Sequence, residues 1–145
     1  MKRIIKTIIA FVIILSVILP LMSCGKYTSS YRAMGLIRNQ TSHSLTVSFS
    51  SLEGQLVFKI KRTDKGREGD IKYYAAIEGG ELSLHYDIYG TKDALAHISG
   101  GETVNSRGGY VESGRNVYII IEAKNAKNGK VQVELNPQSW YVEIN

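Results

Sequence analysis

The most regular stretch of the chain is Glu81-Leu82-Ser83-Leu84-His85-Tyr86-Asp87-Ile88-Tyr89, in which apolar residues occupy every second position. Successive side chains of a β-strand point to opposite faces of its sheet, so this alternation predicts a half-buried strand. The even positions are expected to face a core. The odd positions then place His85, Asp87 and Tyr89 in one outward row.

The same alternation recurs on both sides of this stretch, in residues 45–49, 56–60, 71–77, 131–135 and 140–144. Weaker strands are expected at 31–37, at 94–98 and around Tyr110. Residues 117–121 are apolar on both faces, which predicts a central strand that is covered on both sides.

Turn signals separate these stretches. Glu53-Gly54 and Asn128-Gly129 each stand between two alternating runs, and both predict hairpins. Gly79-Gly80 predicts a turn before residue 81. About nine or ten short strands at roughly 8–12-residue spacing, with no helical period, predict an all-β fold. We expect a single antiparallel β-sandwich or jelly roll over residues 31–145.

The N-terminus has a different character. Lys2, Arg3 and Lys6 precede an apolar run at residues 8–19, which Pro20 ends. As a helix this run would be about 18 Å long at ~1.5 Å per residue, whereas the hydrocarbon core of a bilayer is about 30 Å thick. The run is therefore too short to span a membrane and is typical of a signal peptide.

The run closes on Leu21-Met22-Ser23-Cys24, which resembles the lipobox of bacterial lipoproteins, with Met22 where a smaller residue is usual. The resemblance implies a signal helix at 1–23, cleavage before Cys24 and a diacylglyceryl thioether on that cysteine, often with an acylated amino group. Residues 24–30 would form the lipidated cysteine and a short flexible tether. The protein would be held at the outward face of a cell membrane, or at the outer membrane of a Gram-negative cell. The alternatives are an ordinary signal peptide with a free thiol and a short uncleaved anchor.

Part of the chain also resembles the small jelly-roll domains of secreted bacterial proteins, including prepeptidase C-terminal-like and carbohydrate-binding-like sandwiches. The resemblance is carried by residues 81–90, 114–122 and 130–135. It implies no catalytic residues.

Composition limits the partners. The chain carries a formal charge of +5, but three of its 18 basic residues lie in the signal, which leaves 15 against 13 acidic residues. No dense basic stripe remains, so nucleic-acid binding is not expected. Cys24 is the only cysteine, so the domain has no intrachain disulfide and depends on packing for stability.

The sequence contains no recognised catalytic or metal-binding motif. His43, His85 and His97 fit no zinc-binding spacing, and no nucleophile elbow or phosphate loop is present. We predict no metal, no cofactor and no enzymatic activity. The alternative is a hydrolase that uses His85 and Asp87, because a carboxylate beside an imidazole can orient it for acid–base work.

Two groups of residues are candidates for ligand binding. The first is the outward row of His85, Asp87 and Tyr89. The second is Tyr73-Tyr74, since one ring of an adjacent pair in a strand must face outward. Exposed tyrosines stack on sugars and anchor protein partners. We predict a membrane-anchored binding or scaffolding module for a polysaccharide or an envelope protein, with an accessory subunit of an envelope complex as the alternative.

Overall fold

The computed structural model describes residues 26–61, 68–112 and 114–135. All the regular secondary structure within these ranges is β-strand, and every strand pairing is antiparallel. The predicted all-β fold is therefore confirmed. The signal at 1–23 and the strand expected at 140–144 lie outside the described residues. The strands are β1 (Ser30–Met34), β2 (Ile37–Gln40), β3 (Ser44–Ile60), β4 (Gly69–Ala76), β5 (Gly79–Asp87), β6 (Asp93–Ser99), β7 (Thr103–Val111) and β8 (Val117–Leu135).

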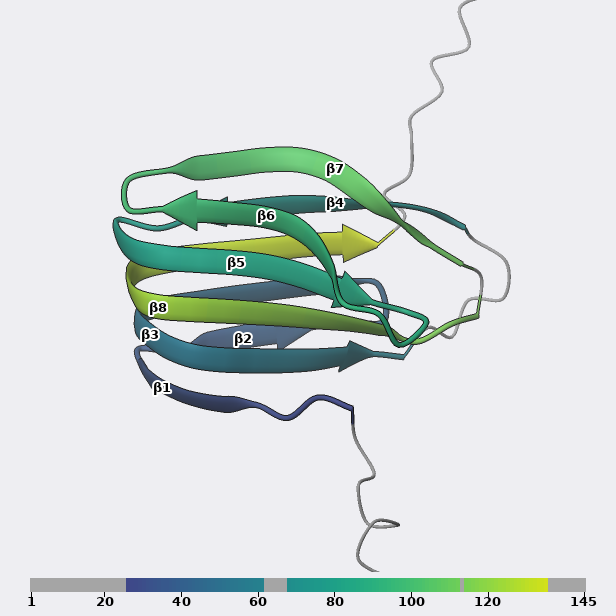
Figure 1. Ribbon diagram of the computed structural model, residues 1–145, viewed down its shortest axis with the longest axis horizontal. Helices are drawn as coiled ribbons and strands as arrows, with labels where there is room; N and C mark the ends of the chain where they lie inside the picture. The colour runs from purple at the N-terminus through teal and green to yellow at the C-terminus, as the bar shows by residue number, and fades with distance from the viewer. Residues whose placement is uncertain (1–25, 62–67, 113, 136–145) are drawn as a thin grey trace, which may run out of the picture.

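Two long strands, β3 and β8, form the centre of the fold. They pair along nearly their whole length, from Ser44 opposite Glu134 to Ile60 opposite Val117. Both strands curve round near their middle, at the left-hand side of Figure 1. The first half of β3 therefore pairs with the second half of β8 in one layer, and the remaining halves pair in the other.

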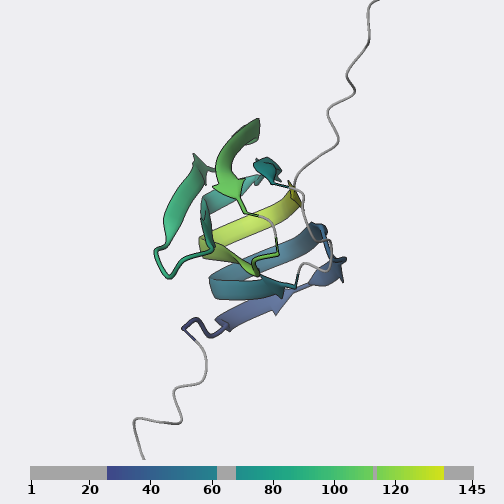
Figure 2. The same cartoon turned by 90° about the vertical axis from the view of Figure 1, so that its right-hand side faces the viewer.

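The other strands complete two layers, which Figure 2 shows from the end of the molecule, along the strands. Layer 1 contains β2, the first half of β3, the second half of β8, β4 and β7. Layer 2 contains β1, the second half of β3, the first half of β8, β5 and β6. The result is the predicted antiparallel sandwich.

The hairpin predicted at Glu53-Gly54 is wrong, because β3 continues through both residues. The register of β3 on β8 shifts between Leu52 and Gly54, and Gly54 has a φ of 99°. A Cβ on Gly54 would lie 2.3 Å from the carbonyl oxygen of Ser30, so β1 approaches too closely for a side chain here. The glycine serves a bulge in a bent strand rather than a turn.

The hairpin predicted at Asn128-Gly129 is also wrong, because β8 runs unbroken from Val117 to Leu135. The residues on either side of the pair bond to β3 and not to each other. Asn125 and Asn128 have φ values of 51° and 43°, a conformation that asparagine tolerates better than most residues. β8 therefore bends, as β3 does, at residue types that are also common in turns.

The expected strand at 31–37 is two strands separated at Gly35, which has a φ of 61°. β1 pairs with residues 51–55 of β3 in layer 2, and β2 pairs with residues 45–48 in layer 1. Met34 and Ile37 flank this break, and both are 70% exposed. The chain thus changes layer at an edge of the sandwich and leaves two large apolar side chains in solvent.

The core lies between the layers and is formed by the inward positions of the alternating strands. Leu82 and Leu84 of β5 belong to it, as predicted. The prediction of a strand covered on both sides is confirmed at Ile119, Ile120 and Ile121, which have no exposed surface. Ile120 is buried without joining the core cluster, because it points to the outer face of layer 2.

The contact between Gly129 and Phe49 gives a direct test of the bend. A Cβ at Gly129 would lie 2.2 Å from the Phe49 ring. Gly129→Ala should therefore destabilise the fold by about 1–3 kcal/mol, the usual range for overpacking. The same substitution should cost less in a Phe49→Leu background, which makes room for the methyl group. Urea unfolding of the two single variants and the double variant measures this coupling, and strictly additive effects would contradict the close contact.

Candidate functional site

The outward row predicted on β5 is confirmed in part. Leu84 faces the core, and His85 lies on the opposite face, next to Ile120 of β8. Asp87 shares that face but is only 1% exposed, so its predicted exposure is wrong. Tyr89 lies beyond the end of β5 at Asp87 and does not continue the row.

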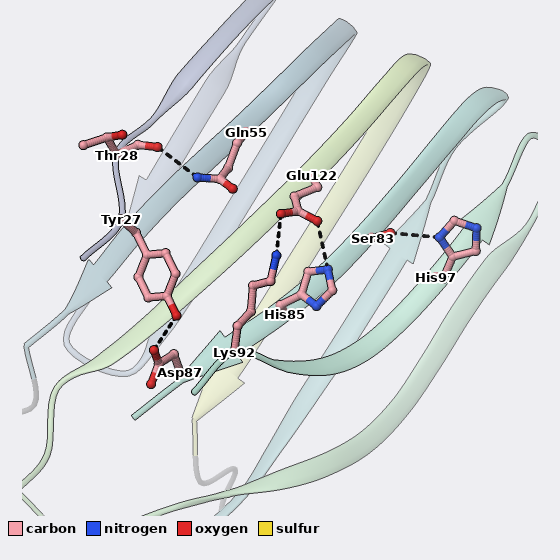
Figure 3. Close-up of polar contacts among 9 residues, drawn as sticks. All are labelled: Tyr27, Thr28, Gln55, Ser83, His85, Asp87, Lys92, His97 and Glu122. Carbon is pink, nitrogen blue, oxygen red and sulfur yellow. Dashed lines mark hydrogen bonds and ion pairs between the residues drawn. The ribbon is translucent and has the colours of Figure 1, made fainter. Parts of the chain in front are cut away.

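Asp87 is buried because the segment before β1 crosses over it. We call residues Lys26–Ser29 the strap. The Tyr27 hydroxyl donates to Asp87 Oδ2 at 2.5 Å (Figure 3). Lys26 Nζ lies 3.2 Å from the same oxygen. The amide N–H of Gly90 donates to Oδ1 at 2.5 Å. Both carboxylate oxygens thus have donors inside a covered site, as a buried charge requires.

The rest of the strap is held by β3 and β8. The Tyr27 ring lies 5.6 Å from the Tyr118 ring at an angle of 59°. Gln55 Nε2 donates to the carbonyl of Thr28 at 3.0 Å, and the amide of Val57 donates to Ser29 Oγ at 2.9 Å. Residues 26–29, expected to belong to a flexible tether, are instead bound to the outer face of layer 2.

The strap contacts determine the ionisation of Asp87. Burial acts to raise the pKa of this carboxyl, but hydrogen bonds from Tyr27, Gly90 and Lys26 favour the carboxylate more strongly. The net result is a pKa below the usual range. The ionised form therefore holds the strap at neutral pH.

His85 belongs to a separate polar cluster. Its Nε2 lies 3.2 Å from Glu122 Oε2 without the alignment of a hydrogen bond, and Lys92 Nζ lies 2.7 Å from Glu122 Oε1 (Figure 3). Burial of the imidazole is the main reason that the pKa of His85 is lowered, and it outweighs the opposing charge of Glu122. His85 is therefore neutral at pH 7.

The two members of the proposed hydrolase pair do not act on each other. Asp87 is bound by the strap, and the carboxylate beside His85 is that of Glu122. Ser83 and His97, one step along the same face, bond to each other at 2.8 Å. This face therefore does not bring His85 and Asp87 together, as the hydrolase alternative requires.

As expected for an adjacent pair in a strand, one ring of Tyr73-Tyr74 points inward and the other outward, so only Tyr74 stays a candidate for ligand binding. Tyr73 is 7% exposed, and its hydroxyl donates to the carbonyl of Leu95 at 2.9 Å. This bond ties β4 to β6 across the core. Tyr74 is half-buried on the outer face of layer 1.

Tyr74 lines a groove of about 470 Å³ on that face. Strand register places Thr46, Gln132, Tyr74 and Asn105 side by side across β3, β8, β4 and β7. A second row follows toward the strand ends, formed by Ser44, Glu134 and Lys72, with His43 at the rim. We call this feature the layer 1 groove.

Three polar side chains in the first row of the layer 1 groove are available for a ligand, whereas Ser44 in the second row bonds to Thr41. Within the described part of the chain, no hydrogen bond involves the side-chain amides of Asn105 or Gln132, or the hydroxyl of Tyr74. This contrasts with the outer face of layer 2, where Asp87, Glu122 and His97 all have partners. The arrangement of one aromatic ring between two amides is suited to a ligand with apolar faces and many hydroxyls.

Of the residues that line this groove, the sequence pattern indicated Tyr73 and Tyr74 as candidates. Thr46, Asn105, Gln132 and Glu134 were missed, although Thr46, Gln132 and Glu134 stand at the outward positions of clearly alternating runs. The missing information was the order of the strands, which brings β3, β8, β4 and β7 together.

Tyr89 contributes to a smaller hollow of about 390 Å³, lined also by Tyr86, Ile88, Thr91, Asp93 and Tyr110. The guanidinium of Arg115 lies 5.2 Å above the Tyr89 ring. A hydrogen bond to Glu112 is the main cause that raises the pKa of Tyr89. Two side chains of the protein itself therefore already engage this exposed ring.

Neither a metal site nor a membrane-spanning helix occurs in the described residues. Among those described, no three side chains of the His, Cys, Asp and Glu types gather as a metal site. The described ranges also contain no helix with the length and apolar character needed to cross a bilayer.

Comparison with known proteins finds only distant similarity. No protein-family model and no curated protein sequence matches the chain. Among solved structures, a family 29 carbohydrate-binding module complexed with mannohexaose is 11% identical, with 75% of this chain and 90% of that chain covered and a TM-score of 0.38. A carbohydrate-binding module from Cellvibrio mixtus lichenase 5A in complex with cellotriose is 15% identical, with 78% and 100% covered and a TM-score of 0.38. We therefore derive the function from the groove's own residues.

The strap predicts a stability that depends on Asp87. Asp87→Asn should destabilise the protein at pH 7 by about 1–3 kcal/mol, because a buried charged acceptor of three donors is lost. The lowered pKa of Asp87 means that its contribution is present above pH ~4 and is lost as the pH falls through the folded-state pKa. Urea unfolding of parent and variant at pH 7 and at acid pH should show the difference shrinking in acid.

The matched control is Asp93→Asn, which removes an exposed carboxylate nearby and should change stability by less than about 0.5 kcal/mol. If the parent and the Asp87→Asn variant are equally stable at pH 7, the contacts of the strap with Asp87 contribute nothing to the free energy of unfolding.

Proposed function

We propose that this chain is a non-catalytic binding module that takes a polysaccharide into the layer 1 groove and is held at a bacterial membrane by lipid on Cys24. The observation that carries the proposal is the position of Tyr74 between the side-chain amides of Gln132 and Asn105, which form no hydrogen bond with another described residue. An aromatic ring can stack on the apolar face of a sugar, and amides offer both donors and acceptors to its hydroxyls.

The shape of the groove favours an elongated ligand. Neighbouring strands are about 4.8 Å apart, so the row from Thr46 to Asn105 covers roughly 14 Å across three strand intervals. The second row, with Lys72 and Glu134, broadens the site and adds one charge of each sign. A chain of sugar units that crosses the strands would contact several of these side chains at once.

The lining also supports binding without catalysis. Glu134 is the single carboxylate among the described residues that line the groove. Hydrolysis of a glycosidic bond generally uses a pair of carboxyl groups about 5–10 Å apart. The groove has the groups that hold a sugar and lacks that pair within its described lining.

A protein partner is the second candidate, and a different surface favours it. Met34 and Ile37 are each 70% exposed at the edge where β1 and β2 meet. Edge strands with exposed apolar side chains are suited to pairing with a strand of another protein. An accessory subunit would use this edge, whereas a polysaccharide module would use the groove.

The proposed anchor comes from the order of charge, apolar run and Leu21-Met22-Ser23-Cys24. Two or more acyl chains hold a protein stably on a membrane, whereas a single chain binds marginally, at about 10⁴ M⁻¹. The intact mass of protein from the membrane fraction should correspond to a chain that begins at a lipidated Cys24, and Cys24→Ala should leave the precursor uncleaved. An unmodified Cys24 in the mature protein would refute the anchor.

Tyr74→Ala tests the groove. Parent and variant are first screened against an array of bacterial and plant glycans, and hits are measured by calorimetry. Loss of a stacked ring worth about 1.5 kcal/mol should weaken binding about tenfold. Gln132→Ala should have a smaller effect of about 0.5–1.5 kcal/mol, the value of one hydrogen bond.

Tyr31→Ala is the matched control, since Tyr31 is an exposed tyrosine of β1 that does not line the groove. It should leave glycan affinity unchanged. If no glycan binds the parent, or if Tyr74→Ala and Tyr31→Ala bind equally well, the polysaccharide proposal is refuted.

A further inference from the structure

We propose that the outer face of layer 2 around Asp87 is the surface that rests on the membrane, so that the layer 1 groove opens away from the lipid. The inference builds on the proposed lipidation of Cys24 and adds an orientation to it. The partner of this face is the headgroup layer of a phospholipid bilayer.

The first argument is the length of chain between the anchor and the fold. Lys26 is held by Asp87, and Cys24 is two residues earlier. Two residues reach at most about 7 Å, whereas a free segment of six residues would reach about 20 Å. The headgroup region on each side of a bilayer is roughly 5–8 Å deep. A lipid on Cys24 therefore places Lys26 within the headgroups or directly above them.

The second argument is the chemistry of this face. Lys26 and Lys92 have side chains that are 48% and 38% exposed, and each is paired with an acid, Asp87 or Glu122. Asp87 lies beneath Lys26 and is almost fully covered, so the Lys26 ammonium group is the more exposed member of this ion pair. Lys59 Nζ lies 5.7 Å from the centre of the Tyr118 ring. Lysine and tyrosine side chains are both suited to the interface, because each joins an apolar body to a polar end.

The third argument is the position of the groove. Tyr74 and Gln132 lie on the outer face of layer 1, and Asp87 and Tyr118 lie on the outer face of layer 2. Stacked sheets are about 10 Å apart, and side chains extend beyond both. When layer 2 rests on the lipid, the groove is turned toward the surrounding solution, where a polymer can reach it.

The strap is thus a positioning device, and releasing it should remove the orientation. Once Lys26–Ser29 are detached, the chain between Cys24 and β1 can extend to about 20 Å, which is enough for the domain to tumble. The fold and the lipid would remain, but neither face would be held toward the membrane.

Fluorescence quenching from the bilayer tests the orientation. Cys24 is the only cysteine and is blocked when lipidated, so a cysteine introduced elsewhere can be labelled alone. Thr91→Cys places a fluorophore beside Gly90 on the strap side, and Asn39→Cys places one on the outer face of layer 1; both positions are exposed. Full-length lipidated protein is reconstituted in phosphatidylethanolamine–phosphatidylglycerol vesicles with a nitroxide on the headgroups.

The probe at Thr91 should be quenched several-fold more strongly than the probe at Asn39. Equal or reversed quenching in protein with a confirmed lipid mass overturns the orientation. A mature chain whose Cys24 thiol is free for labelling refutes the proposed anchor instead, so the two failures are distinguishable.

Two further variants test the role of the strap. In the double variant Tyr27→Phe/Asp87→Asn, the probes at positions 91 and 39 should be quenched to a similar extent. A short Gly-Ser insertion between Gly25 and Lys26 should do the same while it leaves the strap bonds and the fold intact, as circular dichroism can verify. If the insertion leaves the Thr91-to-Asn39 ratio unchanged, the short connection does not orient the domain and the proposal is overturned.

Discussion

The bend that β3 and β8 share is the constraint on which this structure depends. A single antiparallel ladder of this length would be one long sheet with an uncovered apolar face. Because both strands bend together, near Gly54 in β3 and between Asn125 and Gly129 in β8, the two halves of the sheet face each other and bury the same set of inward side chains. The bend also returns the far ends of β3, Ser44 and Ile60, to the same end of the molecule. The groove and the strap therefore occupy opposite faces of one sandwich.

Much of the fold could be predicted, because alternation of apolar and polar residues is a local signal of burial. It identified the inward positions of β4, β5 and β8 correctly. It could not distinguish a turn from a bulge, since glycine and asparagine suit both by the same backbone freedom. At Gly54 and Gly129 the difference is made by close contacts with Ser30 and Phe49, which are distant in the sequence. A bent strand and a hairpin have the same local sequence pattern.

The candidate site was harder to predict for the same reason. Alternation correctly assigns Asp87 to the outer face of its strand, but nothing in residues 81–89 indicates that Tyr27 covers it. The strap itself has the composition of a polar linker, because its partners are far along the chain. Tyr74 was found from its neighbour Tyr73, whereas Asn105 and Gln132 join it only through strand order. Sites built across strands require the topology before their residues can be grouped.

The two outer faces differ in how their polar groups are satisfied, and this difference separates their roles. On layer 2, Asp87, Glu122 and His97 are bonded to tyrosine, lysine and serine of the same chain, and the His85 Nε2 atom is buried and faces Glu122. Such a face has little left to offer a specific ligand and is suited to a nonspecific surface such as lipid headgroups. On layer 1, Gln132 and Asn105 flank Tyr74 without protein partners among the described residues. A ligand there would form its hydrogen bonds without breaking existing ones, so the energy of each contact goes into affinity.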